Sequence, residues 1–271
     1  METMPESSAP RAATPTGRRL VASDIDGTLL RTGEPATPNV RHAVNAVLHA
    51  GHLLVLATGR SLIGAVPVGV QLGLDDTWIV ASNGAITARL HRDRYELVEQ
   101  HDVNAETAIR VALGQSPALL VAAEITGAGW RVSRRFPAGL LNGPQYVRPL
   151  TEVAANPTPR VAFHGLDAHR IVPALVAYGF TAIATRLDWI DVTAPGVSKA
   201  TALEKVREQL GVESHNTTAL GDGENDVEML QWAADGIAMG HASPFVAGAA
   251  NRSTGSLDDD GAASALWSLL S

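Results

Sequence analysis

The sequence predicts an α/β protein: a Rossmann-like parallel-sheet core with an α+β domain inserted into it. Three apolar runs, 19–23, 53–57 and 78–81, alternate with stretches of helical periodicity. Strands that are apolar throughout are typical of parallel sheets, and strand–helix–strand units join such strands through right-handed crossovers. From 85 to 188 the pattern changes to shorter strand-like pieces, scattered charges and several prolines, and the strand–helix alternation then resumes.

The first core segment contains three strands and two helices. A strand at 19–23 precedes a helix at 38–50, whose apolar residues recur at helical spacing until Gly51. Glycine is common immediately after a helix, so Gly51 marks the helix end. A strand at 53–57, a further helix and a strand at 78–81 complete this segment.

The second core segment follows the same alternation. In chain order we expect a strand at 190–192, a helix at 198–210, a strand at 217–220, a helix at 225–234, a strand at 236–239 and a helix at 261–270. The expected domains are therefore a disordered leader at 1–18, rich in Pro, Ser, Thr and Ala, a core formed by 19–84 and 189–271, and an inserted domain at 85–188.

Composition restricts the classes of function. The chain has 271 residues, 45% of them hydrophobic, which is enough for a sizeable core. Its formal charge of −7 argues against a nucleic-acid partner, since such proteins concentrate Lys and Arg on one face. Cysteine is absent, which leaves no disulfide or thiolate metal site and makes a reducing cytoplasm the simplest location. No apolar run approaches the ~20 residues of a membrane-spanning helix.

Acidic residues follow two of the predicted strands, at the sheet edge where α/β proteins bind ligands. Asp24 and Asp26 are separated by one residue, and Gly27 allows a sharp turn that brings both into one pocket. Taken alone, this pair is equally well explained by an Asx-turn residue and a helix cap. Asp222 and Asp226 add two acids at another strand end, and four crowded carboxylates repel each other unless a cation is bound. Oxygen ligands of this kind favour Mg²⁺.

Groups that bind an anion occur at neighbouring strand ends. Thr58 offers a hydroxyl, and Gly59 and Gly27 offer backbone N–H groups. Lys199 offers a compact cation at the start of a helix that Ser198 is able to cap. A lone Lys at a helix start is usually only solvated, but this one lies between two acidic strand ends. Phosphoryl transfer requires such an arrangement of donors and positive charge.

Together these segments resemble the haloacid dehalogenase superfamily, and in detail its Cof-type phosphatases with a C2 cap. Four motifs occur in the family's order, at 24–30, 57–60, 196–199 and 221–230, with the long insertion between the second and third. The sequence departs from the family pattern at Ala200, where Gly is usual, and at His241, where Asn is common.

The resemblance implies specific roles. Asp24 is the expected nucleophile that becomes an aspartyl phosphate, and Asp26 the expected general acid and base. Mg²⁺ is expected on the side chains of Asp24 and Asp222 and on the backbone carbonyl of Asp26, with Asp226 orienting bound waters and Lys199. The expected phosphate-binding residues are Thr58, Gly59, Lys199, Asn225 and Asn83.

The predicted function is hydrolysis of phosphoric monoesters of small metabolites, with sugar phosphates, flavin mononucleotide and pyridoxal phosphate as permitted substrates. Alternatives are a phosphomutase with the same core, a phosphorylated signalling receiver and a non-catalytic binding module; a receiver predicts one short domain without the insertion. The oligomeric state is left open. Residues that we considered for contacts with the leaving group are Trp130, Arg134, Arg135, His164 and Arg186. His241, after the last core strand, was considered for contact with the substrate. Surface or packing roles are commoner for such residues.

Overall fold

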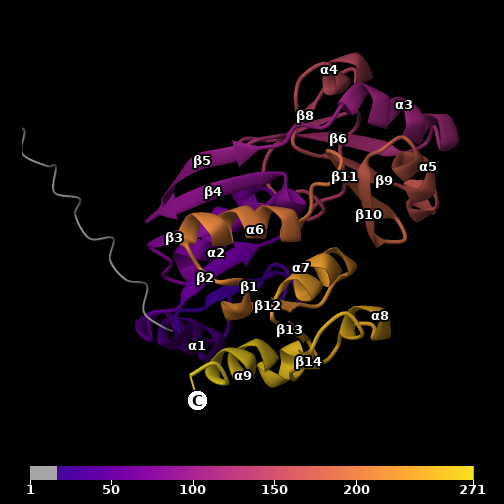
Figure 1. Ribbon diagram of the computed structural model, residues 1–271. Coiled ribbons are helices and arrows are strands. Elements are labelled where there is room, and N and C mark those ends of the chain that lie inside the picture. The colour runs from indigo at the N-terminus through magenta and orange to yellow at the C-terminus, as the bar shows by residue number, and fades with distance from the viewer. Residues whose placement is uncertain (1–16, 271) are drawn as a thin grey trace, which may run out of the picture.

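The computed structural model of the protein describes residues 17–270. The disordered leader expected at 1–18 lies outside the described residues except for Gly17 and Arg18. The described chain forms two sheets with helices packed on them, and Figure 1 shows two bodies, a larger core and a smaller domain at its upper right.

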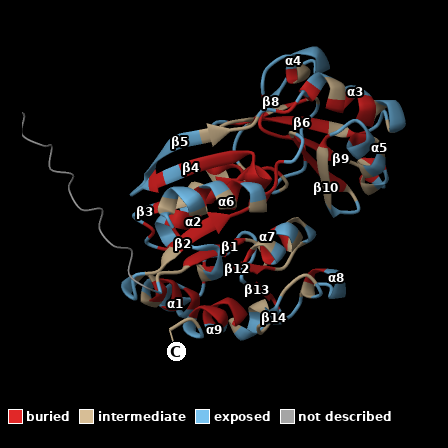
Figure 2. Ribbon diagram, in the orientation of Figure 1, coloured by how far each residue is buried: buried red, intermediate tan, exposed pale blue. Residues whose placement is uncertain are grey.

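The larger sheet has eight strands in the order β14-β13-β12-β1-β2-β3-β4-β5. The first six are parallel, and β4 and β5 add an antiparallel edge. The strands are β1 (Leu20–Ser23), β2 (Leu53–Ala57), β3 (Asp76–Ala81), β4 (Ile86–His91), β5 (Arg94–Gln100), β12 (Thr217–Gly221), β13 (Asp235–Ala238) and β14 (Arg252–Ser253). Figure 2 shows the central strands buried, whereas the edge strand β5 is mostly exposed.

Helices cover both faces of this sheet. One face packs on α1 (Pro38–His49), α2 (Leu62–Gln71) and α9 (Gly261–Trp267), and the other on α6 (Lys199–Leu210), α7 (Val227–Trp232) and α8 (Pro244–Ala247). Side chains alternate between the faces along each strand, so Val21 belongs to the first hydrophobic cluster and Leu20 and Ala22 to the second. The two-sided core explains why these strands are apolar throughout.

The smaller domain has a six-stranded sheet in the order β10-β11-β9-β6-β7-β8. Its strands are β6 (Leu120–Ile125), β7 (Gly129–Val132), β8 (Gln145–Val147), β9 (Val161–His164), β10 (Thr181–Arg186) and β11 (Trp189–Thr193), and its helices are α3 (Ala105–Gln115), α4 (Leu150–Ala154) and α5 (Val172–Ala177). Residues of these helices form one apolar cluster with one face of the sheet. The other face carries a separate cluster that includes Trp130, Phe136 and Trp189.

The domain boundaries differ from those expected at both ends of the insertion. β4 and β5, which we assigned to the inserted domain, pair antiparallel with the core sheet. β11, which we assigned to the parallel core, pairs antiparallel with β9 and β10 of the smaller sheet. The predicted boundaries at 84 and 189 are therefore wrong by sheet membership. The boundary at 189 was misplaced because both faces of β11 are buried, and such a strand has no pattern that identifies its sheet.

Most core elements agree with the prediction, and the fold class is confirmed. α1 ends before Gly51, which has the left-handed backbone conformation expected after a helix (φ 86°). The helix expected at 225–234 is shorter, because Glu224–Asp226 forms a 3₁₀ turn and α7 begins only at Val227. The last helix likewise stops at Trp267.

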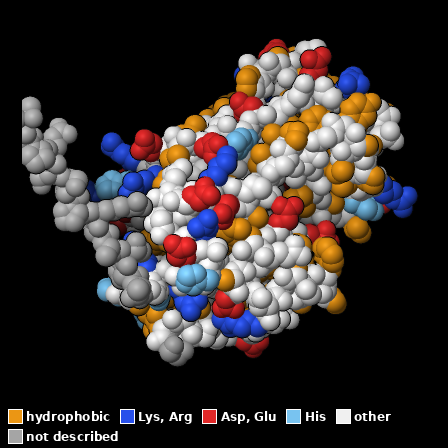
Figure 3. Space-filling view, viewed as in Figure 1, with side chains coloured by type: hydrophobic (Ala, Val, Ile, Leu, Met, Phe, Trp, Pro, Cys, Tyr) orange, Lys and Arg blue, Asp and Glu red, His pale blue; other side chains and the backbone are white. Residues whose placement is uncertain are grey.

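Side chains on the visible surface are mixed in character. Figure 3 shows acidic and basic side chains interspersed over the core, while hydrophobic side chains gather more densely over the smaller domain. One exposed ion pair, between Lys205 Nζ and Glu99 Oε1 at 2.6 Å, joins α6 to β5. Within residues 17–270, the helices are all too short or too polar to span a bilayer.

Candidate active site

The candidate site lies at the carboxyl ends of four neighbouring strands, β12, β1, β2 and β3. Asp222 follows β12, Asp24 follows β1, Thr58 follows β2 and the turn Ser82–Gly84 follows β3. Parallel strands end at the same edge of the sheet, and ligands of open α/β sheets bind at that edge. Residues from both core segments therefore meet at one place.

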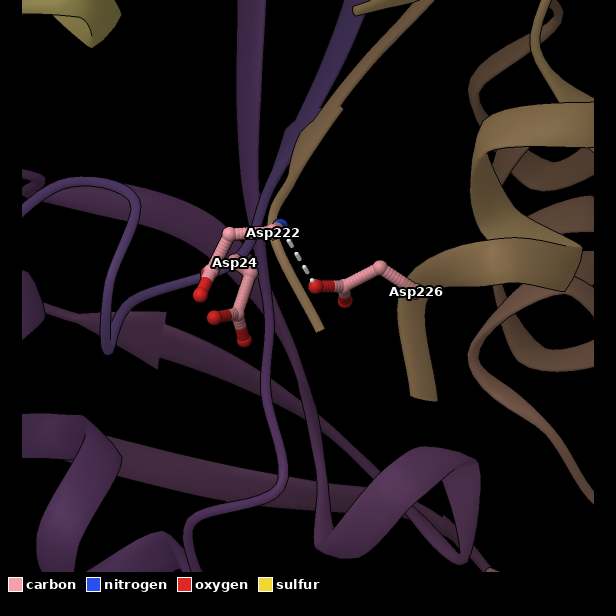
Figure 4. Close-up of side chains that lie close together, drawn as sticks. All are labelled: Asp24, Asp222 and Asp226. Carbon is pink, nitrogen blue, oxygen red and sulfur yellow. Dashed lines mark hydrogen bonds between the residues drawn. The ribbon is translucent and has the colours of Figure 1, made fainter. Parts of the chain in front are cut away.

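Three acidic side chains form the centre of the site. One carboxylate oxygen from each of Asp24, Asp222 and Asp226 lies within 4.8 Å of the other two, and Figure 4 shows the side chains converging. Burial raises the pKa of Asp24 well above its ordinary value; Asp226 and Asp222 add to the rise, and Lys199 opposes it. Burial also raises the pKa of Asp222, again with a contribution from Asp226. The single positive charge of Lys199 does not fully offset the effects of burial and of the neighbouring negative charges on these acids.

Lys199 lies between two of the acids. Its Nζ donates to Asp24 Oδ1 at 2.7 Å and to Asp226 Oδ1 at 2.6 Å, and its side chain is fully buried. α6 begins at this residue. The Ser198 side chain accepts a hydrogen bond from the Thr201 N–H, and the Thr201 side chain accepts one from the Ser198 N–H, which confirms the predicted cap.

Asp226 organises the loop after β12. Its Oδ2 accepts hydrogen bonds from the backbone N–H groups of Asp222 (3.0 Å) and Gly223 (2.9 Å), while its Oδ1 is used by Lys199. Asp222 Oδ1 accepts a hydrogen bond from Thr28 Oγ1 at 2.9 Å. Gly27 approaches Asp222 so closely that a Cβ at this position would collide with its carboxylate. Only glycine fits there without displacing the acid.

Asp24, Asp26 and Asp222 line one cavity, but Asp26 lies outside the group formed by Asp24, Asp222 and Asp226. Its carboxylate accepts hydrogen bonds from Arg60 Nε (2.6 Å), Arg60 Nη2 (2.7 Å) and Thr32 Oγ1 (2.7 Å). Burial disfavours its charge, but these hydrogen bonds and the charge of Arg60 outweigh burial and hold the pKa of Asp26 below its ordinary value. Asp26 is therefore ionised at neutral pH in this conformation.

Of the expected phosphate-binding residues, Thr58, Gly59 and Asn225 line the same cavity as Asp24 and Asp222, whereas Asn83 is buried and does not line it. Thr58 is buried, and its Oγ1 accepts a hydrogen bond from the Arg60 N–H at 3.0 Å. Asn225 Nδ2 donates to Asn83 Oδ1 at 3.0 Å. Gly59 lies next to both amides: a Cβ added there would be 3.1 Å from Asn83 Oδ1 and 3.4 Å from Asn225 Nδ2.

A cavity of about 430 Å³ opens above these groups, and the smaller domain provides its other wall. Cavity-lining residues from the smaller domain include Trp130, Leu141, Asn142, Arg160, Arg186 and Trp189. The indole nitrogen of Trp130 donates to Asn142 O at 2.8 Å and that of Trp189 to Asp191 Oδ1 at 3.1 Å. With their polar edges engaged by the protein, the two indoles offer mainly apolar surface to a ligand.

The structure separates the residues that we considered for leaving-group contacts. Trp130 and Arg186 line the cavity, whereas Arg134, Arg135 and His164 do not. Arg134 donates to Ala118 O at the surface, and His164 packs against Phe136 and Trp189. His241 is also absent from the cavity wall, and its Nε2 lies 3.6 Å from Asp222 Oδ2.

Sequence reasoning did not assign a role to several residues that shape the site. Arg60 stands inside a motif that we quoted, so its basic side chain next to Thr58 was an available signal. Thr28 likewise lies in the first motif. Arg160 and Asp191 carried no signal, because they reach the site from the other sheet through contacts that spacing along the chain does not reveal.

A divalent cation fits the acidic group. The donors are all carboxylate oxygens within reach of one another. Burial, and after it the charge of Asp226, raises the pKa values of Asp24 and Asp222, and a bound cation would offset both effects. Hard oxygen donors suit Mg²⁺ or a similar ion.

Comparison with known proteins decides the family. A family model described as haloacid dehalogenase-like hydrolase matches residues 21–112 and 170–266, more than half of the chain. The chain belongs to this family. The family, the fold class and the enzyme class expected from the sequence are confirmed: the protein is a haloacid dehalogenase-like phosphatase.

Relatives of this haloacid dehalogenase-like protein carry the names of phosphatases. A phosphoglycolate phosphatase of Natronomonas pharaonis is 32% identical over 91% of this chain and 95% of its own length. A 5-amino-6-(5-phospho-D-ribitylamino)uracil phosphatase of Bacillus subtilis, YitU, is 28% identical over 90% of this chain and 94% of its own. An HMP-PP phosphatase of Cronobacter sakazakii is 28% identical, with coverage of 83% and 85%.

A solved structure supports the same family. The haloalkanoate-superfamily phosphatase BT1666 of Bacteroides thetaiotaomicron is 26% identical, with a TM-score of 0.78 and coverage of 98% of this chain and 99% of that chain. The similarity therefore includes the smaller domain as well as the core, and this domain corresponds to the inserted cap expected from the sequence. We call it the cap below.

Proposed function

We propose that the protein is a Mg²⁺-dependent phosphatase that hydrolyses phosphate monoesters of small metabolites through an aspartyl phosphate on Asp24. The observation that carries the proposal is the convergence of Asp24, Asp222 and Asp226 on one point, with Lys199 bonded to two of them. A buried acid at the end of β1, next to a fixed cation, is suited to attack an electrophilic phosphorus.

The side chains of Asp24 and Asp222 and the backbone carbonyl of Asp26 are the proposed holders of Mg²⁺, with Asp226 acting through the loop and through Lys199. When bound, the ion would supply positive charge beside the transferring phosphoryl group and would favour the ionised form of Asp24. Lys199, Thr58, the Gly59 backbone and Asn225 are proposed to bind the phosphoryl oxygens.

The proposed reaction has two steps. In the first, an Asp24 carboxylate oxygen bonds to phosphorus, and the ester oxygen leaves with a proton from Asp26. In the second, Asp26 accepts a proton from water, whose oxygen bonds to phosphorus as the Asp24–phosphorus bond breaks, and inorganic phosphate is released. The ionised state of Asp26, favoured by Arg60, suits the second step directly; the first step requires Asp26 to leave Arg60 and take up a proton.

The cap is proposed to select the leaving group. The cap side of the cavity includes Trp130, Trp189 and Leu141 and combines their apolar surface with two cations, Arg160 and Arg186. This wall suits a leaving group with an apolar or planar part. Sugar phosphates, flavin mononucleotide and pyridoxal phosphate remain the proposed substrate range, and the cytoplasm the proposed location.

Phosphate release from a panel of metabolite monoesters in the presence of MgCl₂ tests the proposal, with Asp24→Asn as the variant. We expect the wild-type protein to release phosphate from at least one ester, a chelator to stop it, and Asp24→Asn to lose turnover while remaining folded by circular dichroism. Turnover by Asp24→Asn near the wild-type rate would show that the nucleophile is assigned wrongly. Release that persists in excess chelator would refute the metal.

A further inference from the structure

A buried polar group in the cap contacts the phosphate-binding loops of the core. Arg160, just before β9, forms ion pairs with Glu124 of β6 and Asp191 of β11. Its Nε lies 3.1 Å and its Nη2 3.0 Å from Glu124 Oε2. Its Nη1 lies 3.4 Å from Asp191 Oδ2. All three residues are at most 5% exposed. Burying charged side chains costs free energy unless they are paired. This buried group therefore points to a specific role in the cap.

The first contact with the core fixes a peptide plane. Arg160 Nη1 donates to the backbone carbonyl oxygen of Gly59, in the loop after β2. The peptide that follows Gly59 is trans, so its N–H, which belongs to Arg60, points away from that carbonyl. This N–H donates to Thr58 Oγ1 at 3.0 Å. Through one rigid peptide, Arg160 therefore sets the orientation of the Thr58 hydroxyl.

The second contact holds the turn after β3. Ser82 Oγ donates to both carboxylate oxygens of Glu124, at 2.9 and 2.8 Å, and Asn83 Nδ2 donates to Asp191 Oδ2 at 3.1 Å. Ser82 and Asn83 have φ values of 52° and 56°, a left-handed conformation that residues other than glycine adopt rarely. Asn83 in turn accepts the hydrogen bond from Asn225. The cap acids thus stabilise an unfavourable turn and, through it, orient Asn225.

We propose that Arg160 is a positioning residue for the transferring phosphate, so that the cap completes the phosphate-binding loops in addition to selecting the leaving group. The inference rests on the proposed function, because it takes Thr58 and Asn225 as ligands of the phosphate. Arg160 acts through Gly59 and through Glu124 and Asp191.

Arg160 also lines the cavity, so direct contact with the leaving group is the competing explanation. Its geometry favours the positioning role. Each of its three nitrogens is bonded to a protein group, and its guanidinium carbon lies 4.9 Å from the ring centroid of Trp130. The two roles predict different results, since a positioning residue affects every ester alike and also affects inorganic phosphate, which has no leaving group.

The decisive variant is Arg160→Lys. It keeps a positive charge between Glu124 and Asp191 but cannot present separate nitrogens to Gly59 and both acids. The matched control is Arg131→Lys in the same sheet, where the arginine Nη2 donates to the Asn156 and Pro157 carbonyl oxygens. Isothermal titration with inorganic phosphate in MgCl₂ gives the affinity, and kcat and KM are measured on p-nitrophenyl phosphate and on a hexose phosphate.

We expect Arg160→Lys to weaken phosphate binding about tenfold or more, the usual effect of losing hydrogen bonds from a charged group. We also expect kcat to fall by a similar factor on both esters, with Arg131→Lys unchanged. Unaltered phosphate affinity, or a loss confined to one ester, would overturn the proposal and assign Arg160 to the leaving group.

If Arg160→Lys does not fold, Ser82→Ala tests the same connection without removing a charge. Weaker phosphate binding is again expected, and unchanged binding would contradict the proposal. A wild-type protein that neither binds phosphate nor hydrolyses any ester would instead refute the proposed function.

Discussion

Asp24 and Asp26 are two positions apart, yet their surroundings shift their pKa values in opposite directions. Burial among other acids raises the pKa of Asp24, whereas Arg60 and Thr32 outweigh burial and lower that of Asp26. The two acids are thereby prepared for different tasks. A bound cation would favour the ionised form of Asp24, and Asp26 needs to leave Arg60 before it can donate a proton.

Alanine substitutions at Gly27 and Gly33 test the close approach of Gly27 to Asp222. Gly27 and Gly33 have similar backbone angles (φ 82° and 85°), but a Cβ at Gly27 would collide with Asp222, whereas one at Gly33 meets open space. Alanine at either position therefore costs about 1–2 kcal/mol of stability through backbone strain. We expect Gly27→Ala, unlike Gly33→Ala, to lower kcat strongly by displacing Asp222. Phosphate release and urea unfolding measure the two effects, and equal turnover by both variants would contradict the close approach.

The sequence predicted the individual core residues of the site better than their partners. Asp24, Thr58, Lys199 and Asp222 stand directly at strand or helix ends, so the edge of the sheet brings them together once the parallel order is known. The pairing of Asp26 with Arg60 was not predicted, because the chain leaves the strand after Ser23 and the alternation of side chains no longer applies. Which acid binds which cation depends on loop geometry that spacing does not encode.

At the scale of elements, α6 carries Lys199 and is attached to α7 through Glu204. Its carboxylate accepts hydrogen bonds from Arg207 Nε at 2.8 Å and Nη2 at 2.6 Å, and from Trp232 Nε1 at 2.8 Å. Arg207 and then Trp232 lower the pKa of Glu204 to about 2. The contacts depend on the ionised form, so the attachment of the two helices depends on pH.

We expect Glu204→Gln to destabilise the protein modestly at neutral pH, by about 0.5–1 kcal/mol, because this carboxylate is partly exposed. A depressed acid pKa contributes stability that is fully present above the unfolded value of 4.5 and is lost as the pH falls through the folded value of about 2. Urea unfolding across this range should therefore show the difference between wild type and variant shrinking as the pH falls.

Glu208→Gln is the matched control on the same helix. Glu208 lies 3.9 Å from Arg207 Nη2 and is largely exposed. Little change is expected for this variant at any pH, and a constant penalty for Glu204→Gln down to pH 2 would rule out the charge-dependent attachment.

Elements of the core were predictable and the junctions with the cap were not. The apolar runs that form β1, β2 and β12 are buried on both faces, which is the property that the pattern indicates. β11 is also buried on both faces, but its residues Ile190 and Val192 pack with the cap helices, and its Trp189 packs in the apolar cluster with Trp130 and Phe136. Burial alone does not reveal the sheet that a strand joins.

For the whole molecule, a cation bound only by the folded state should add stability. At a concentration 100 times its dissociation constant, Mg²⁺ stabilises the fold by about 2.7 kcal/mol. We expect chelator-treated protein to gain melting temperature on addition of MgCl₂ and Asp222→Asn to gain much less. Differential scanning calorimetry measures both, and equal gains would place the ion elsewhere.

The cap is proposed to select the leaving group and the core to bind the phosphate, which leads to a second prediction for the whole molecule. Residues 105–186 are replaced by the equivalent segment of the HMP-PP phosphatase of Cronobacter sakazakii, with Glu124 and Arg160 kept or restored. We expect the preference among esters to change while the affinity for inorganic phosphate remains. The ester panel and phosphate titration measure these, and an unchanged preference would mean that the cap does not select the leaving group.

The sheet membership of β11 has a mechanical consequence. Only residues 194–198 separate this cap strand from Lys199 at the start of α6. A chain extends by at most about 3.3–3.6 Å per residue, so this tether reaches roughly 20 Å when pulled taut. A large movement of the cap away from the core would therefore pull on Lys199 through residues 194–198. Substrate entry is expected to use cap movements that stay within the length of this segment.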